Sequence, residues 1–128
     1  MEYCPCGDAG YLLKKEKRFG EDVAKIYIAE IITALTYLHG LGIIYRDLKP
    51  DNIIIDEQGH AKLTDFGLSK EGITEEYNSM SFCGSHAYLA PEMLNQKPHG
   101  KSVDWYGVGV LLYEFLAGVP PYFDPNRE

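Results

Sequence analysis

Hydrophobic positions recur with a helical period in two stretches of the chain. Between residues 21 and 40, apolar side chains return every three or four residues, which predicts an amphipathic helix with one face in a core. The stripe consists of Ala24, Tyr27, Ile28, Ile31, Leu35 and Leu38. Gly40 and Gly42 predict the end of this helix, because glycine favours the backbone angles of a helix C-terminus.

The second stretch predicts a helix over residues 102–118. Ser102 is the expected N-cap, Asp104 lies in the first turn and Gly118 is the expected stop. Its interior, residues 108–117, is apolar on nearly every side, so we expect the helix to be buried all round. The remaining chain offers too few partners to cover such a helix, which suggests that the sequence is a piece of a larger domain.

The other predicted elements are short. Residues 1–7 are interpreted as the end of a strand and a turn, and Asp8 as the N-cap of a helix that runs to about Lys17. Two apolar triplets, residues 53–55 and 61–63, flank a turn at Gly59 and predict a β-hairpin. Residues 68–100 lack sustained periodicity and are expected to form a long functional or disordered loop. The predicted fold is mainly α with a small β-hairpin.

Length, charge and cysteine content narrow the function classes. The 128 residues suit one domain, and the net charge of −7 argues against nucleic-acid or acidic-membrane surfaces and favours cationic partners. No apolar run is long enough for a membrane span, and the N-terminus lacks the basic region of a secretory signal. Three cysteines without a second ligand pair make a metal site at Cys4 and Cys6 a weak hypothesis. Reduced thiols and a cytoplasmic location are expected.

The chemistry centres on residues 45–52, which read Tyr-Arg-Asp-Leu-Lys-Pro-Asp-Asn. Asp47, Lys49 and Asn52 supply a carboxylate, a cation and an amide oxygen at fixed offsets, and Asp65 follows in an Asp-Phe-Gly turn. Phosphoryl transfer needs a carboxylate near the acceptor hydroxyl, a cation near the moving group and oxygen ligands for Mg²⁺. We expect the predicted hairpin to bring Asp47, Asn52 and Asp65 to one end of the small sheet.

Four motifs in this order resemble the large lobe of a eukaryotic serine/threonine protein kinase: residues 45–52, the turn 65–67, Ala-Pro-Glu at 90–92, and Asp-Trp at 104–105 with Gly107. Tyr45 and the segments 81–84 and 88–92 point to the AGC group. The resemblance implies a partial C-terminal lobe of a parent α+β fold. Residues 1–128 would then contain the hinge, catalytic loop, activation segment and central buried helix.

The resemblance implies a role for each polar residue of the catalytic loop. Asp47 would be the catalytic base, and Lys49 would neutralise the migrating γ-phosphoryl charge and mark a Ser/Thr acceptor. Asn52 and Asp65 would hold Mg²⁺. Ser85 would bridge Asp47 and Lys49. These assignments describe an ATP-dependent protein serine/threonine kinase.

The same resemblance places the nucleotide. The hinge backbone from Glu2 to Cys4 would pair with adenine, Asp8 would lie near the ribose, and Ile54 and Thr64 would pack against the adenine ring. Taken alone, Ile54 is explained almost as well as a core strand residue. The implied ATP contacts are Glu2, Cys4, Asp8, Lys49, Asp51, Asn52, Ile54, Thr64 and Asp65.

Regulation and substrate choice are also implied. Ser81 matches the position at which relatives carry the activating phosphate, added by an upstream kinase, and Arg46 and Lys70 match the residues that pair with it. Asp51 and Glu114, with Asp8 as a further candidate, match acidic positions that receive arginines upstream of the acceptor. Protein substrates with basic residues near Ser/Thr are therefore expected. Asp104 resembles the buried acid that holds the catalytic-loop backbone.

The chain also departs from the family pattern. Relatives usually read Gly-Thr-Pro-Glu-Tyr where residues 84–88 read Gly-Ser-His-Ala-Tyr, which alters the substrate-facing segment at His86 and Ala87. Cys6 replaces a hinge glycine, and Ala9 replaces a larger apolar residue. No glycine-rich loop, strand lysine or partner glutamate precedes Met1, and the helices expected to cover residues 108–117 are missing.

From these absences we expect the polypeptide to bind ATP poorly and to have negligible activity alone. A truncated, non-catalytic kinase-like binding module is the competing hypothesis, although the intact Asp47, Lys49, Asn52 and Asp65 argue against decay of the parent gene. A nucleotide-binding domain of another fold is a third and weaker possibility, because the sequence lacks a phosphate-binding glycine loop.

Overall fold

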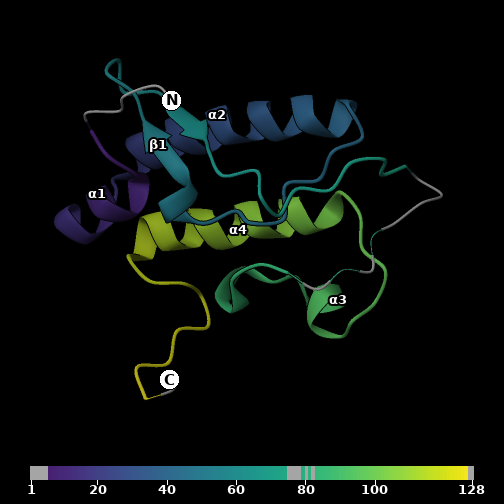
Figure 1. The fold of residues 1–128 in the computed structure, drawn as a ribbon. Helices are drawn as coiled ribbons and strands as arrows, with labels where there is room; N and C mark the ends of the chain where they lie inside the picture. Colours follow the sequence, from purple (N-terminus) through teal and green to yellow (C-terminus); the bar gives the residue numbers. More distant parts are fainter. Residues whose placement is uncertain (1–5, 75–78, 80, 82, 127–128) are drawn as a thin grey trace.

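Two long helices and a small sheet form the centre of the structure, a computed structural model that describes residues 6–74, 79, 81 and 83–126. In chain order the elements are α1 (Ala9–Glu16), α2 (Glu21–Gly40), η1 (Pro50–Asn52), β1 (Ile53–Ile55), β2 (Ala61–Leu63), η2 (His86–Tyr88), α3 (Pro91–Leu94) and α4 (Ser102–Ala117). Figure 1 shows α2 and α4 side by side, with α1 and the hairpin at one end and α3 on the other side of α4. The predicted fold class is confirmed.

The first two helices form where their caps and apolar stripes predict. The Asp8 carboxylate accepts a hydrogen bond of 2.8 Å from the Tyr11 amide, which satisfies an N–H group that α1 leaves unpaired. In α2, Ala24, Ile28, Ile31 and Leu35 are buried. Tyr27 and Leu38, the other members of the predicted stripe, are partly buried against the same core. The predictions for both helices are confirmed.

The predicted hairpin is also present. β1 and β2 are antiparallel, with Ile53 opposite Leu63 and Ile55 opposite Ala61. Asp56 forms the turn, since its carboxylate accepts hydrogen bonds from the amides of Gln58 and His60 at 3.0 and 2.9 Å. Ile53 and Ile55 are almost fully buried, so one face of the hairpin belongs to the core.

The start of α4 differs from the prediction by one residue. Lys101 precedes the helix as its N-cap, and Ser102 is the first helical residue. The Ser102 hydroxyl contacts Glu92 at 3.4 Å and makes no cap. The predicted stop is correct, because Gly118 adopts the left-handed conformation with φ of 85° and ends the helix.

The described part of the chain does not cover α4 on every side, which agrees with the predicted shortage of partners for this helix. One face is buried through residues that include Val103, Gly107, Val110, Leu111 and Phe115. The opposite face carries Trp105, Gly109, Tyr113 and Leu116, all exposed. Four- and three-residue steps place these four on one side of the helix. The described part of the chain therefore leaves a mostly apolar stripe of α4 uncovered.

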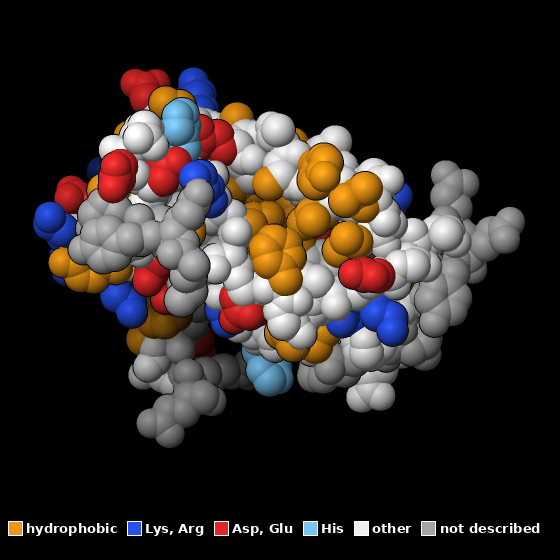
Figure 2. Space-filling view, turned by 45° about the horizontal axis from the view of Figure 1, so that its top comes forward, with side chains coloured by type: hydrophobic (Ala, Val, Ile, Leu, Met, Phe, Trp, Pro, Cys, Tyr) orange, Lys and Arg blue, Asp and Glu red, His pale blue; other side chains and the backbone are white. Residues whose placement is uncertain are grey.

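The main core lies where α1, α2, the hairpin and α4 meet. Phe19, Tyr27 and Phe115 pack edge to face in its centre, with ring centroids 5.0 to 6.3 Å apart. A smaller cluster of Leu89, Ala90, Met93 and Val103 fixes α3 against the start of α4. Hydrophobic side chains also gather on the surface, in the middle of the face that Figure 2 presents.

The described part of the segment from residue 68 to 100 contains two short helices that the sequence pattern did not predict. η2 and α3 are three and four residues long, too short to show a helical period. Pro91 begins α3, where a residue without an N–H group loses no hydrogen bond. Among the described helices, none has the length and hydropathy to cross a bilayer.

Candidate active site

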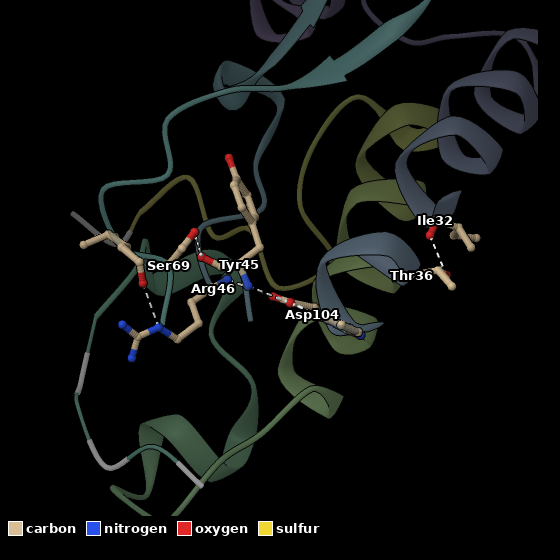
Figure 3. A network of polar contacts seen from close by, with 8 residues as sticks. Ile32, Thr36, Tyr45, Arg46, Ser69 and Asp104 are labelled. Atoms are coloured by element: carbon tan, nitrogen blue, oxygen red, sulfur yellow. Dashed lines mark hydrogen bonds and ion pairs between the residues drawn. The ribbon is translucent and has the colours of Figure 1, made fainter. Parts of the chain in front are cut away.

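Residues 45–52, the predicted catalytic loop, are held in place by the buried carboxylate of Asp104 on α4. Its two oxygens accept hydrogen bonds of 2.8 Å from the backbone amides of Tyr45 and Arg46. His39 at the end of α2 lies 2.7 Å from the same carboxylate. Figure 3 shows Asp104 pointing from its helix into the loop backbone. Asp104 is 1% exposed, so these contacts operate in a low-dielectric interior where charged acceptors are strongest.

Tyr45 locks the loop to the strand that precedes the Asp-Phe-Gly turn. Its ring is fully buried and its hydroxyl donates to the backbone carbonyl of Thr64. Phe66 packs edge to face on the ring, with centroids 5.5 Å apart. Burial raises the pKa of Tyr45 far above its ordinary value, and the negative charges of Asp47 and Asp65 add to the effect. The side chain is therefore a permanent donor.

Asp47, Asn52 and Lys49 converge within this loop. The Asn52 amide donates to both the carboxylate and the backbone carbonyl of Asp47, each at 2.8 Å. The Lys49 ammonium lies 3.5 Å from the Asp47 carboxylate and 3.3 Å from the Ser85 hydroxyl. The link between Asp47 and Ser85 thus runs through Lys49. Asp47 and Asn52 are each 6% exposed, so their orientation is fixed by packing as well as by these bonds.

Asp65 directly follows Thr64, whose backbone contacts that of Asn52. The Thr64 amide donates to the Asn52 carbonyl at 2.9 Å, which brings the two candidate metal ligands to the same end of the hairpin. Asp65 has a φ of 58°, a conformation uncommon outside glycine, and its carboxylate accepts from the Gly67 amide at 3.2 Å. Asp47, Asn52 and Asp65 are therefore brought together as expected.

The donor set of Asn52 and Asp65 fits Mg²⁺. The Asn52 nitrogen is occupied by Asp47, so its side-chain oxygen is available as a ligand, and Asp65 adds a carboxylate. Within the described residues no group of three or more His, Cys, Asp and Glu side chains forms a candidate metal site. A cation that prefers oxygen and keeps water or phosphate oxygens in its shell matches two such ligands.

The residues expected at the nucleotide lie beside the hairpin as far as they are described. Asp8 forms a β-bridge with Ile54, and the Gly7 carbonyl accepts from the Ile55 amide at 3.1 Å. Ile54 is half-buried on β1. The Asp8 carboxylate caps α1, which commits one oxygen to the fold. Glu2 and Cys4 lie outside the described residues.

Arg46 joins the catalytic loop to the predicted phosphosite. It has a φ of 70°, and one guanidinium nitrogen contacts the hydroxyls of Ser79, at 3.1 Å, and Ser81. A second nitrogen donates to the Leu68 carbonyl at 2.8 Å. The main chain of Lys70 pairs with that of Ile44 in an antiparallel bridge. The structure thus brings Arg46 and Ser81 into contact.

Ser79 is a site residue that sequence reasoning treated only as a loop serine. Its side chain is 3% exposed, and its hydroxyl lies 2.9 Å from that of Ser81. Its backbone pairs with His99 in both directions at 2.8 and 2.9 Å. His99 is equally buried, and its Nε2 has no hydrogen-bond partner among the described residues. Only the two-residue spacing of the serines could have indicated that they lie together.

Asp51 and Glu114, the predicted acidic positions for substrate, line one pocket of about 150 Å³. Burial raises the pKa of Glu114, and the nearby charge of Asp51 acts in the same direction. A hydrogen bond from the Tyr88 hydroxyl opposes this shift and ties η2 to α4. Lys14 lines the same pocket and supplies the opposite charge.

Comparison with known proteins finds matches along the whole chain. The family model described as the protein kinase domain matches residues 1–128. The chain is 50% identical to human serine/threonine-protein kinase Sgk2 over 98% of the chain and 34% of that protein. It is 47% identical to rat RAC-beta serine/threonine-protein kinase over 100% of the chain and 27% of that protein. It is 50% identical to protein kinase 3 of Dictyostelium discoideum over 99% of the chain and 15% of that protein. The chain thus spans about a third or less of the length of these relatives.

Proposed function

Because this chain belongs to the protein kinase domain family, we propose that it is the catalytic-loop part of an enzyme that transfers phosphate from Mg-ATP to serine and threonine hydroxyls of proteins. The relatives confirm the AGC-group resemblance drawn from the motifs. We also propose a cytoplasmic location, where the free thiols of Cys6 and Cys83 would stay reduced.

The observation that supports this proposal best is the convergence of Asp47, Asn52 and Lys49. The Asn52 amide donates one hydrogen bond to the Asp47 carboxylate and one to the Asp47 backbone carbonyl, which orients the carboxylate for an incoming hydroxyl. Holding the reacting groups before the chemical step is the main contribution that a protein makes to phosphoryl transfer. An ion pair that served the fold alone would not need the Asn52 amide aimed at the same carboxylate.

In the proposed reaction, Asp47 receives the proton of the substrate hydroxyl as its oxygen bonds to the γ-phosphorus. The bond from that phosphorus to the β,γ-bridging oxygen breaks, and ADP leaves with the electron pair. Lys49 offsets the negative charge on the transferred group, and Ser85 keeps its ammonium in place. Asn52 and Asp65 would hold Mg²⁺, which screens the phosphate oxygens.

Substrate choice and regulation form the second part of the proposal. The pocket lined by Asp51 and Glu114 is suited to an arginine or lysine of the substrate, and the net charge of −7 favours the approach of basic peptides. Phosphate on Ser81 would gain a charge-assisted contact with Arg46, which already touches the hydroxyl. That contact would link the activation segment to the catalytic loop, with Lys70 as a second candidate cation.

The test is a chimera in which residues 1–128 replace the matching segment of human Sgk2. We expect phosphorylation of a serine peptide with upstream arginines, and a loss of about 10²- to 10⁴-fold in kcat for Asp47→Asn, the range for removal of a general base. Asp22→Asn, on the exposed first turn of α2, is the control. The proposal would be wrong if the chimera has the same unfolding temperature as Sgk2 but transfers no phosphate. That result would favour a non-catalytic binding module.

A further inference from the structure

Positive charge is concentrated at the end of α1. Four of the 12 basic residues of the chain lie between positions 14 and 18, with Glu16 as the one acid among them. These four residues, Lys14, Lys15, Lys17 and Arg18, form the basic cluster. All are exposed, and none forms an ion pair with an acidic residue in the described part of the chain. Since the whole chain has a net charge of −7 and residues 14–18 contribute +3, the other residues carry −10.

The helix dipole does not explain the whole basic cluster. Lys14 and Lys15 lie in the last turn of α1, where the negative end of the dipole favours cations. That end is equivalent to only about half an elementary charge, against four cations. Lys17 follows the last helical residue as the C-cap, and Arg18 lies beyond it. Most of the positive charge therefore has no partner within the described chain.

The backbone beneath the basic cluster is held in place on both sides. Leu13 and Phe19, which flank it, are 5% and 7% exposed and belong to the main core. The Phe19 amide donates to the Phe115 carbonyl at 2.7 Å. The Lys17 carbonyl packs against Gly118 at the end of α4, and Lys17 has a φ of 72°, uncommon for a residue other than glycine. Like charges on a rigid turn repel one another, so an anionic partner would relieve the repulsion without first ordering the backbone.

The basic cluster adjoins the pocket of Asp51 and Glu114, the acidic pocket. Both Asp51 of the catalytic loop and Lys14 of the basic cluster line this pocket, so it lies between the two. Gly118, which also lines it, contacts the Lys17 carbonyl. Figure 1 shows α1 beside the end of α4. A peptide with its serine at the catalytic loop and an arginine in the acidic pocket would therefore continue towards the basic cluster.

We propose that the basic cluster binds an acidic segment of the protein substrate, upstream of the arginines that enter the acidic pocket. The inference rests on the proposed kinase function and adds a second charge requirement to the substrate. A peptide segment suits the charge distribution better than an anionic membrane, because a flat negative surface would also face the −10 of the other residues. The cations are exposed, so the interaction should weaken as salt is added.

Fluorescein-labelled peptides and the polypeptide of residues 1–128 provide the test, read out as fluorescence anisotropy. Each peptide contains one serine with two arginines upstream of it. The first peptide carries three glutamates upstream of the arginines, the second carries three glutamines there, and the third carries the three glutamates downstream of the serine. At low ionic strength we expect the first peptide to bind about tenfold more tightly than the other two, the scale of three exposed ion pairs. About 0.5 M salt should remove most of this gain.

Two double variants with the same change in charge distinguish the basic cluster from general electrostatics. Lys15→Glu with Arg18→Glu should abolish the preference for upstream over downstream glutamates and favour three lysines at the upstream positions. Lys15→Gln with Arg18→Gln should reduce the preference without reversing any charge. Lys97→Glu with Lys101→Glu, at exposed positions outside the basic cluster, should retain the preference.

No measurable binding, or equal affinity for the peptides with upstream and downstream glutamates, would overturn the inference. A preference that survives Lys15→Glu with Arg18→Glu, or that both glutamate variants lose equally, would also overturn it. So would binding to vesicles that contain phosphatidylserine, if the Lys15 and Arg18 variants abolish it, because the basic cluster would then be a membrane contact. The proposed function fails separately, if the chimera transfers no phosphate to any peptide.

Discussion

Among single residues, Asp104 connects the fold to the proposed chemistry. One buried carboxylate accepts from two consecutive backbone amides and contacts His39, so it fixes the direction in which the chain enters the catalytic loop. Arg46 has a positive φ at this point, a conformation that non-glycine residues adopt only when their surroundings impose it. The two hydrogen bonds that Asp104 accepts supply that constraint.

Replacing Asp104 with asparagine should therefore be costly. Asparagine keeps one acceptor oxygen, loses the charge and leaves at least one buried donor unpaired, which should lower the free energy of unfolding by about 3 kcal/mol. Urea denaturation of the polypeptide would measure it. Asp22→Asn on the exposed first turn of α2 should change the value by less than about 0.5 kcal/mol. Equal stability of the two variants would show that the carboxylate does not hold the loop.

The convergence of the polar residues of the catalytic loop could be predicted, because their order and spacing follow from the chemistry that they serve. Asp47, Lys49, Asn52 and Asp65 all lie where the motifs suggested. The burial of Ser79 and of His99, whose Nε2 has no partner among the described residues, could not be predicted, since it depends on a bridge between two segments twenty residues apart. Contacts of that kind leave no periodic pattern in the sequence.

At the scale of elements, α4 ends against the segment that joins α1 to α2. A Cβ atom added to Gly118 would lie 2.2 Å from the Lys17 carbonyl oxygen, and the glycine has a φ of 85°. The Phe19 amide donates to the Phe115 carbonyl at 2.7 Å nearby, so the two backbones are held together and have little room to separate. Both the backbone angle and the close approach require glycine here.

Two glycine-to-alanine substitutions in and after α4 should therefore have opposite effects. Gly118→Ala should destabilise the chain by more than about 2 kcal/mol through strain and overpacking. Gly109→Ala lies in the middle of α4, where an added Cβ meets nothing within 4 Å. It should stabilise by about 0.5–1 kcal/mol, because alanine is the better helix former. Thermal unfolding followed by circular dichroism would distinguish them, and a stable Gly118→Ala variant would contradict the geometry.

The hairpin turn is tied to α2 by a charge contact that depends on pH. One Glu30 oxygen lies 2.5 Å from His60 Nδ1, and the other accepts from the Ala61 amide at 2.7 Å. The hydrogen bond with Glu30 is the main cause that raises the pKa of His60, and the charges of Glu30 and Asp56 add to it. Lys62, which pairs with Asp56, acts in the opposite direction.

A raised pKa in the folded state means that protonated His60 stabilises the fold. This contribution is complete below the unfolded value near 6.5 and disappears as the pH rises through the higher folded value. Between about pH 6 and pH 8, the wild type should lose more stability than His60→Gln does. NMR titration of the His60 ring should show a pKa above 6.5 that falls towards it in Glu30→Gln. Parallel stability curves for wild type and His60→Gln would disprove the coupling.

The long elements followed from periodicity and caps, and the short ones did not. The bounds of α2 and the hairpin agree with the prediction, because apolar spacing determines which face is buried. The N-cap of α4 is Lys101 and not Ser102, whose hydroxyl contacts Glu92 instead of a backbone amide. η2 and α3 depend on Pro91 and on packing against α4, neither of which a periodic search detects.

At the scale of the whole molecule, the described chain forms a main core and a smaller cluster but leaves large apolar side chains exposed. On α4, Trp105 is 40%, Tyr113 48% and Leu116 39% exposed, although the helix is apolar almost throughout. Isolated apolar side chains are normal on protein surfaces, but a continuous stripe along a helix favours association. The chain also spans 34% or less of each of the three relatives compared. Experiments on the isolated polypeptide therefore report on that part alone.

The last prediction is that residues 1–128 self-associate through this α4 stripe. Sedimentation velocity should show a weight-average mass that rises with protein concentration in the micromolar range, despite the net charge of −7. Tyr113→Lys with Leu116→Lys places two charges on one side of the helix and should return the chain to the monomer mass of 14.4 kDa. Val23→Lys with Ile26→Lys makes the same change in charge on the exposed face of α2 and should not. If both double variants become monomeric, charge repulsion explains the effect and the stripe is not the interface. If only the α4 variant does, that stripe is the surface through which the isolated chain associates.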